Sequence, residues 1–314
     1  MNDSSSKFKV GILLALILVI AIFFRFYKIT EIPPGLYPDE ATNGVNALDA
    51  LSTGDFKVFY PENNGREGLF MNHQALSVKV FGAQPWALRV VSGVFGTLTV
   101  LGLFFLTRLL WSERIALVAS YLVAVSFWPV NFSRIGFRAI MLPFILVWAF
   151  YFLWKGLIDK KLSRLAIAGI IYGAGFHTYI SWRVSPLLIV LFFLMLLFNR
   201  EHKKSFVIKS FLVLIVFSVL AASPLLLYYF KNPADFLGRA AQVSIFNLPS
   251  PITALTESTI KTLSMFNIYG DGNWRHNLSG RPELFWPIGL GFLIGLITTV
   301  RHRMSYKNIF LTGW

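Results

Sequence analysis

Residues 210–230 read SFLVLIVFSVLAASPLLLYYF, without one charged side chain. A helix needs about 20 mostly apolar residues to cross the hydrocarbon core of a bilayer, because each residue adds about 1.5 Å along its axis. This stretch is long enough to cross, and similar apolar runs recur along the whole chain. The stretch therefore predicts a protein that lies in a membrane.

The recurrence of these runs predicts a bundle of spanning helices. Of the 314 residues, 55% are hydrophobic and 14% are charged, whereas soluble domains average about 25% charged residues. Some runs are short, so helix tilt and tryptophans near the proposed ends must complete them. We expect an all-α, multi-pass membrane protein, and the eight predicted spans are residues 10–27, 88–110, 115–130, 139–154, 165–180, 184–198, 206–230 and 284–300.

The distribution of charge predicts the orientation of the bundle. With the N-terminus in the cytoplasm, the short cytoplasmic segments hold 15 of the 29 Lys and Arg residues and only four of the 15 acidic residues. Their net charge is +11, against +3 for the outer segments. This asymmetry is typical of membrane proteins with basic loops in the cytoplasm. It predicts a plasma membrane location, in bacteria the inner membrane, and explains the net charge of +14 without a nucleic-acid partner.

Two segments, residues 28–87 and 231–283, are too polar to span and are expected to form outer loops. In the first, apolar residues recur at helical spacing in two places, at Ala41, Val45 and Leu48 and again at Leu69, Leu76 and Val80. The spacing favours two amphipathic helices on the membrane surface, with simple loop packing as the alternative.

The last residues of the sequence and the absence of several catalytic motifs limit the functions that the protein can have. A ninth apolar run begins near residue 307, so we expect residues 1–314 to be one transmembrane domain and the N-terminal part of a longer protein. The sequence has no cysteine, which excludes a disulfide scaffold and a cysteine nucleophile. It also lacks the phosphate-loop, dinucleotide-binding, HExxH and GxSxG motifs. A membrane enzyme without these motifs would act at the outer face of the membrane on lipid-borne substrates.

The densest polar cluster follows the first span and includes Asp39 and Glu40. One interpretation is structural, with Asp39 as the N-cap of the next helix. The other is chemical, since a carboxylate near the bilayer can act as a general base or a metal ligand.

Basic residues on the outer side form the second group of candidates. Arg66 and Glu67 open the second surface helix, where a phosphate could meet free backbone N–H groups, although a surface ion pair is the simpler explanation. Arg134, Arg138 and Arg183 stand at span ends against the usual charge bias. An anionic ligand would explain them, and contact with ordinary lipid headgroups would do so equally well.

Several stretches together resemble the membrane-embedded C-type glycosyltransferases. The resemblance is to bacterial family-39 enzymes, which are related to protein O-mannosyltransferases and the lipid A aminoarabinose transferase. It covers most of the chain, and its order and topology are more specific than any one motif. The matching stretches are Tyr37-Pro-Asp-Glu-Ala41, Gly65-Arg-Glu-Gly-Leu-Phe70, the entry to the second span at residues 81–93, Ser133-Arg-Ile-Gly-Phe-Arg138, Tyr179–Pro186 and Asn277–Pro282.

The resemblance implies a reaction and a set of site residues. A sugar, hexose or pentose, would move with inversion from a polyprenyl phosphate to a hydroxyl of a glycan, lipid or protein. Asp39 and Glu40 would be catalytic. Substrate would be bound by Arg66, Glu67, Arg134, Arg138, Tyr179 and Arg183. A divalent metal serves some relatives, and Glu67 and His73 are the candidate ligands here.

Two other functions fit a polytopic protein. One is a transporter or flippase of a lipid-linked or anionic substrate, and the other is a non-catalytic scaffold. Transporters often carry repeats with charged residues at the midplane, whereas this sequence has no sustained repeat and its charges gather at the outer ends of the spans. Convergence of Asp39, Arg66, Arg138 and Arg183 on one cavity would favour the enzyme.

Overall fold

A computed structural model of the chain describes residues 3–198 and 203–301. These residues are mostly helical, and their only sheet joins strands β1 (Phe59–Tyr60) and β2 (Arg66–Glu67). The α-helices are α1 (Asp3–Phe26), α2 (Pro38–Thr53), α3 (Leu69–Phe81), α4 (Pro85–Leu110), α5 (Glu113–Val125), α6 (Phe127–Phe132), α7 (Met141–Ile158), α8 (Leu162–Ala174), α9 (Ser185–Phe198), α10 (Lys204–Lys231), α11 (Pro233–Val243), α12 (Pro251–Met265) and α13 (Trp286–Arg301). The short 3₁₀ turns are η1 (Arg138–Ile140), η2 (Gly175–His177), η3 (Ile180–Val184) and η4 (Ile245–Asn247).

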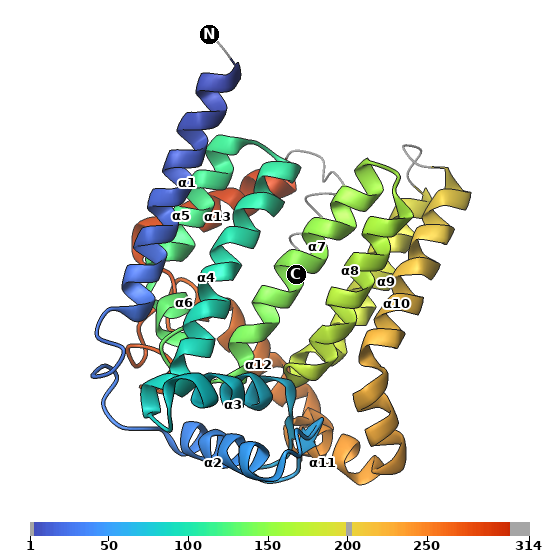
Figure 1. The fold of residues 1–314 in the computed structure, drawn as a ribbon. Coiled ribbons are helices and arrows are strands. Elements are labelled where there is room, and N and C mark those ends of the chain that lie inside the picture. Colours follow the sequence, from blue (N-terminus) through green and yellow to red (C-terminus); the bar gives the residue numbers. More distant parts are fainter. Residues whose placement is uncertain (1–2, 199–202, 302–314) are drawn as a thin grey trace.

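The long helices form a bundle (Figure 1). In it α1 packs against α4 and α5, α4 against α7, α7 against α8, and α8 against α10. Five helical segments are long and apolar enough to cross a membrane: Ser6–Phe26, Pro85–Leu110, Arg138–Ile158, Ile180–Phe198 and Lys204–Lys231. Their exposed leucines, isoleucines and phenylalanines suit a hydrocarbon environment. The expected all-α membrane class is thus supported.

Helices occur at all eight predicted spans, but three are short. The run at residues 115–130 breaks after Val125, and α6 begins at Phe127. Pro129 has no N–H with which to bond the carbonyl of Val125, so α5 cannot simply continue. The run at 165–180 ends as a helix at Ala174, and the last predicted span holds a short apolar helix at Trp286–Thr299. The start of the ninth run lies outside the described residues.

Both helices predicted between the first two spans are present. α2 and α3 lie across the end of the bundle opposite the N-terminus (Figure 1). They pack on each other through Ala47, Ala50 and Ala75, because alanines let two helices approach closely. Pro38 occupies the first helical position of α2, and Gly54 ends the helix with φ 75°. Their location on a membrane surface stays a prediction.

The pairing of α8 with α10 depends on two glycines of α8, Gly169 and Gly173, which are four residues apart. A Cβ at Gly169 would lie 2.5 Å from the Leu214 carbonyl oxygen, and one at Gly173 would lie 2.1 Å from that of Ser218. Only glycine lets these backbones touch. The similar pair in α13, Gly291 and Gly295, faces no heavy atom within 4 Å.

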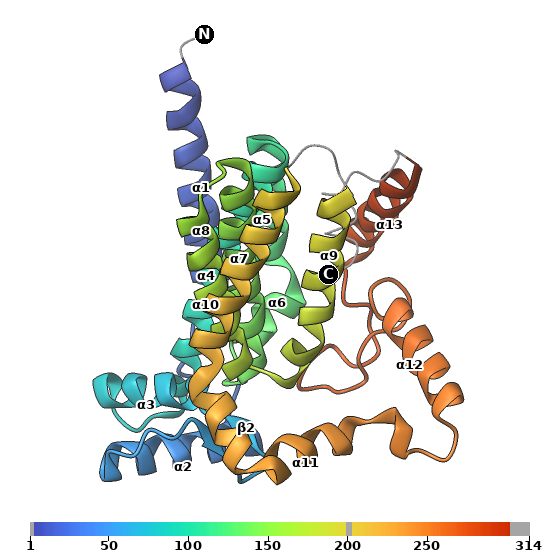
Figure 2. The same cartoon turned by 90° about the vertical axis from the view of Figure 1, so that its right-hand side faces the viewer.

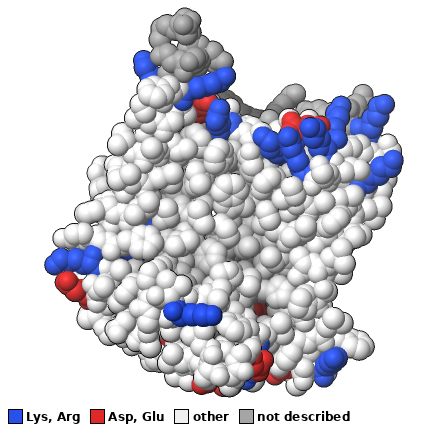
Figure 3. Space-filling view, in the orientation of Figure 1, with Lys and Arg blue, Asp and Glu red and all other residues white. Residues whose placement is uncertain are grey.

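The charged side chains gather at the two ends of the bundle (Figure 3). In that view Lys and Arg predominate at the end that carries the N-terminus, whereas the end with α2 and α3 mixes acidic and basic residues. The face between them is almost free of charge. Figure 2 shows α11 and α12 extending from the bundle at the α2 end, before the chain returns to α13.

Candidate active site

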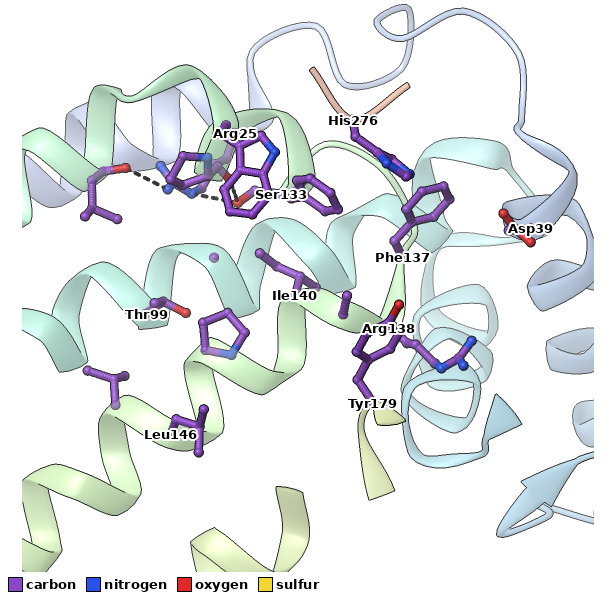
Figure 4. Close-up of a pocket in the computed structure, with 18 of the residues that line it drawn as sticks. Arg25, Asp39, Thr99, Ser133, Phe137, Arg138, Ile140, Leu146, Tyr179 and His276 are labelled. Atoms are coloured by element: carbon purple, nitrogen blue, oxygen red, sulfur yellow. Dashed lines mark hydrogen bonds between the residues drawn. The ribbon is translucent and has the colours of Figure 1, made fainter. Parts of the chain in front are cut away.

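A cavity of about 920 Å³ lies between α4, the α5–α6 break and α7 and reaches α2 (Figure 4). Its walls differ in chemistry along its length. Side chains of α4, α6 and α7 make one part apolar, including Leu103, Leu106, Trp128, Leu146, Val147 and Phe150. The other part is polar and is lined by Asp39, Asn63, Arg66, Arg138, Tyr179 and His276 among others. Such a cavity suits a ligand with an apolar chain and a charged head.

Asp39 presents its carboxylate at the polar part of the cavity. One oxygen accepts a hydrogen bond from Asn63 Nδ2 at 2.7 Å, and the other lies 3.9 Å from Arg275 Nη1. The side chain is about half exposed, so substrate can reach it. The structural interpretation of the sequence made Asp39 the N-cap of α2, and this interpretation is wrong. The cap is Tyr37, and Asp39 is the second helical residue because Pro38 takes the first position.

Glu40 is fully buried and does not line the cavity. Its carboxylate forms an ion pair with Arg89 on α4 at 3.0 Å. It also accepts backbone hydrogen bonds from Gly136 at 2.7 Å and from Tyr37 at 3.1 Å. Glu40 therefore ties α2 to α4 and to the segment before α7. Among the two adjacent acids, only Asp39 lines the cavity.

Arg66 also lines the cavity, although most of its hydrogen bonds go to α2. Its terminal nitrogens donate to Asn43 Oδ1 and Asn46 Oδ1, and Nε donates to the Glu62 carbonyl. Burial lowers the pKa of Arg66, and the positive charge of Arg138 lowers it further. The guanidinium thus fixes α2 while it adds positive potential to the cavity.

Glu67 joins two of the predicted phosphate ligands. Arg138 Nε donates to Glu67 Oε2 at 3.1 Å, and Arg183 Nη2 lies 3.9 Å from Oε1. The guanidinium of Arg138 lies over the ring of Tyr179, 5.3 Å from its centroid. Arg138 and Tyr179 line the cavity (Figure 4). Because one acid faces two arginines, the cluster keeps a net positive charge.

Two predicted arginines lie outside the cavity lining. Arg183 donates to the Phe236 carbonyl and the Tyr229 hydroxyl, and it lies over the Phe236 ring. Arg134 donates to the carbonyls of Phe24, Tyr27 and Ile32, each at 2.8 Å. Those carbonyls are at and beyond the C-terminal end of α1, where a cation is favourable. Of the four residues expected to converge, Asp39, Arg66 and Arg138 do so, and Arg183 joins them only through Glu67.

The candidate metal ligands have other partners. Both oxygens of Glu67 face arginines, and His73 Nδ1 lies 2.7 Å from the Leu69 carbonyl of its own helix. Within residues 3–198 and 203–301, no group of three or more acidic or histidine side chains is arranged to hold a metal ion.

Sequence reasoning missed the residues that the second polar segment brings to this cavity. His276 and Asp271 line it, and Arg275 reaches Asp39. They directly precede the stretch 277–282 that carried part of the resemblance. The acidic and basic side chains of this segment could have marked it as a candidate site in the sequence, but only folding brings them close to α2.

The comparisons with known proteins assign the family. The family model for dolichyl-phosphate-mannose-protein mannosyltransferases matches residues 70–228. The chain belongs to this family. The matched residues run from α3 to α10 and include Arg89, Arg138 and Arg183. The resemblance inferred from the sequence motifs is thereby confirmed.

A curated relative agrees with that assignment, and solved structures share the fold. Over 210 residues the chain is 24% identical to the "Putative mannosyltransferase YkcB" of Bacillus subtilis, covering 64% of this chain and 28% of the relative. The Archaeoglobus fulgidus oligosaccharyltransferase in its apo form has a TM-score of 0.60 at 14% identity, over 99% of this chain and 47% of that one. The same archaeal enzyme, AglB, in complex with an inhibitory peptide and a dolichol-phosphate, has a TM-score of 0.59 at 15% identity, with 98% and 46% coverage. These structures share the fold, and the chain spans less than half the length of each relative.

Proposed function

We propose that this protein transfers a glycosyl group from a polyprenyl phosphate to an acceptor hydroxyl. The observation that carries the proposal is one cavity with an apolar part, the cation Arg138 and the accessible carboxylate of Asp39. A polyprenyl-phosphate sugar has the matching sequence of groups, an apolar chain, a phosphate and a reactive sugar carbon. The family match supports mannose as the first sugar to test.

Asp39 is the proposed general base. Its carboxylate would take the proton of the acceptor hydroxyl while the oxygen attacks the anomeric carbon from the side opposite the phosphate. The product would then have inverted configuration. Asn63 holds one carboxylate oxygen, which fixes the orientation of the base before substrate binds.

Arg138 is the proposed principal ligand of the phosphate. Its Nε donates to Glu67, and its two terminal nitrogens donate no hydrogen bond to any residue that the structure describes. These nitrogens can donate a pair of hydrogen bonds to phosphate oxygens. Arg66 adds positive charge near the bound phosphate while it keeps the hydrogen bonds that hold it to α2. Preorganised positive charge stabilises the departing phosphate, and such a site needs no nucleotide.

The distribution of charge along the bundle supports a reaction on the outer face. If the end rich in Lys and Arg faces the cytoplasm, the end with α2, α3 and the cavity faces outward. The lipid-linked donor would then be used on the outer face of the plasma membrane, which in bacteria is the inner membrane. The acceptor would be a glycan, a lipid or a protein.

Substitution of Asp39 tests the proposal. We expect Asp39→Asn to lower transfer about 10²- to 10⁴-fold, since the amide cannot take a proton. The assay uses the full chain in lipid nanodiscs, with polyprenyl-phosphate mannose and a membrane extract as acceptor, and measures polyprenyl phosphate released. Asp49→Asn, an exposed change on the same helix, is the matched control.

The result that would contradict this mechanism is equal turnover by wild type and Asp39→Asn. The absence of turnover with every polyprenyl-phosphate sugar, combined with movement of such a lipid between leaflets, would favour a flippase.

A further inference from the structure

The segment from Asp271 to Asn277, here called the 271–277 loop, is held against the polar part of the cavity. Asn131 Nδ2 donates to the carbonyls of Arg275 at 3.0 Å and His276 at 2.9 Å. The Trp274 ring meets the Tyr37 ring edge-on, with centroids 5.6 Å apart. These contacts join the loop to the segment before α2 and to α6. Because Arg275 Nη1 also lies 3.9 Å from Asp39 Oδ2, the loop has a defined position beside Asp39.

Within this loop, His276 and Asp271 form a dyad. Nδ1 of His276 lies 2.9 Å from Asp271 Oδ2. Because a carboxylate only accepts, Nδ1 must carry the proton, and Nε2 is the nitrogen left to react. Burial alone would raise the pKa of Asp271, but the Asn273 N–H and His276 bring it below its ordinary value. Asp271 thus stays ionised at neutral pH.

The imidazole is also fixed by aromatic contacts. Its ring centroid lies 5.4 Å from that of Phe132 and 5.7 Å from that of Phe137. Figure 4 shows His276 beside Phe137, at the part of the cavity that also carries Asp39 and Arg138. Nε2 forms no hydrogen bond with any residue in the described part of the chain, and both His276 and Asp271 line the cavity. A histidine held so firmly, with one nitrogen unused, suits proton transfer.

We propose that the Asp271–His276 dyad is the general acid for the leaving phosphate, a role separate from the base role of Asp39. The proposal rests on the proposed glycosyl transfer. Asp271 acts as a positioning residue that orients the imidazole and stabilises its charged form. His276 is the residue that contacts the phosphate.

With Asp39 as base and His276 as acid, every proton and electron pair in the reaction is accounted for. The acceptor oxygen forms a bond to the anomeric carbon, and its proton passes to Asp39. The bond from that carbon to the phosphate oxygen breaks, and its electron pair leaves with the phosphate. Nε2 of protonated His276 gives its proton to that phosphate, whose second pKa is near 6. Water then returns the proton from Asp39 to His276, and both groups are reset.

The charges around His276 set the expected pH dependence. Asp271 lies on its own loop, as does Arg275, and the other charged groups lining the cavity are Asp39, Arg25, Arg66 and Arg138. The acid form of His276 is required, so turnover should fall at alkaline pH. The loss of Asp271 charge should move that fall to lower pH, because the imidazolium loses its stabilising partner.

The test compares pH profiles of His276→Gln, His276→Phe and Asp271→Asn with the wild-type full chain in nanodiscs. We expect both His276 variants to lose about 10²-fold or more in kcat, with little change in the KM for the acceptor, and to lose the alkaline fall. His276→Phe keeps an aromatic ring between Phe132 and Phe137, so it separates chemistry from packing. Asp271→Asn should keep the alkaline fall but shift it to lower pH. Glu257→Gln, an exposed change on α12, is the control.

A second readout does not need turnover. Above about pH 7, where the phosphate is already mostly a dianion, undecaprenyl phosphate should bind wild type more weakly as the pH rises, and His276→Gln should remove this weakening. A His276→Phe variant with wild-type kcat and pH profile would overturn the inference while leaving the glycosyl transfer intact. Wild-type protein without any turnover would instead contradict the proposed function, and the binding experiment would still decide the role of His276.

Discussion

At the scale of single residues, the adjacent carboxylates of Asp39 and Glu40 have different roles because their surroundings differ. Asp39 is accessible and held by an amide, whereas Glu40 is buried with Arg89 and backbone N–H groups. A buried acid with a full set of partners is anchored in the fold, because removing any partner would leave an unpaired buried charge. The side chain that keeps solvent access is the one suited to catalysis.

The binding role of Arg138 leads to the first prediction. Arg138→Gln should weaken binding of undecaprenyl phosphate by about 1.5–3 kcal/mol, because a charged hydrogen bond is lost. Arg138→Lys should restore little, since the contact is expected to be bidentate. Calorimetry or a fluorescent lipid probe measures the affinity, with the exposed Lys79→Gln as control. Unchanged affinity in Arg138→Gln would make this arginine a structural partner of Glu67 only.

Arg183 provides a contrast within the same cluster. Its guanidinium already donates to the Phe236 carbonyl and the Tyr229 hydroxyl and does not line the cavity. Arg183→Gln should therefore reduce affinity less than Arg138→Gln does. An equal or larger loss would indicate that the phosphate reaches the far side of Glu67.

Glu283 leads to a prediction about pH and stability. It is buried, and this burial raises its pKa from 4.5 to about 7. Its neutral form is therefore favoured in the folded protein, so its contribution to stability is complete below about pH 4.5 and is lost as the pH rises to about 7. Glu283→Gln should remove this part of the pH dependence in thermal unfolding measured between pH 4 and 8. Parallel wild-type and variant curves would show that Glu283 does not titrate in this range.

At the scale of elements, small residues and helix breaks shape the bundle. The glycines of α8 bring it against α10, and the break between α5 and α6 turns Trp128 and Phe132 to the cavity. Arg25, buried on α1, donates to the carbonyl of Ala124 at the end of α5 and to Ser133 Oγ. A cation is favourable at the C-terminal end of a helix, so Arg25 supports this break.

The α8–α10 contact can be tested with one methyl group. Gly173→Ala would place a Cβ 2.1 Å from the Ser218 carbonyl oxygen, so the two helices must separate. Overpacking of this kind typically costs about 1–3 kcal/mol, which should appear as a lower Tm in detergent. Gly291→Ala is the control because its Cβ meets nothing within 4 Å. Equal Tm values for the two variants would mean that α8 and α10 do not pack this closely.

At the scale of the whole molecule, the asymmetry of charge predicts which end faces the cytoplasm. Single cysteines at Ser52 and Ser250 should react with an impermeant maleimide in intact cells, while one at Ser163 should react only after lysis. All three residues are exposed, and the absence of native cysteines leaves no background. Labelling of Ser163 alone in intact cells would reverse the orientation and put the cavity on the cytoplasmic side.

The sequence by itself determined the class of the protein and much of its outline. Long uncharged runs demand a membrane environment because unpaired backbone groups cannot be left in hydrocarbon, and helices satisfy these groups locally. The positions of the helices and the two helices after the first span follow from local periodicity. Asp39, Arg66 and Arg138 could also be found, because polar residues near span ends are conspicuous in an apolar chain.

Tertiary structure decided which of these polar residues act together. Glu40 and Arg134 resemble Asp39 and Arg138 in sequence context, yet the first is buried on Arg89 and the second holds the end of α1. His276 reaches the cavity from more than 200 positions beyond Asp39. Hydropathy and spacing report only on neighbours along a helix, whereas the partner of a charged group is set by how distant helices and loops pack. For that reason, the chemistry of the site is a property of the folded chain.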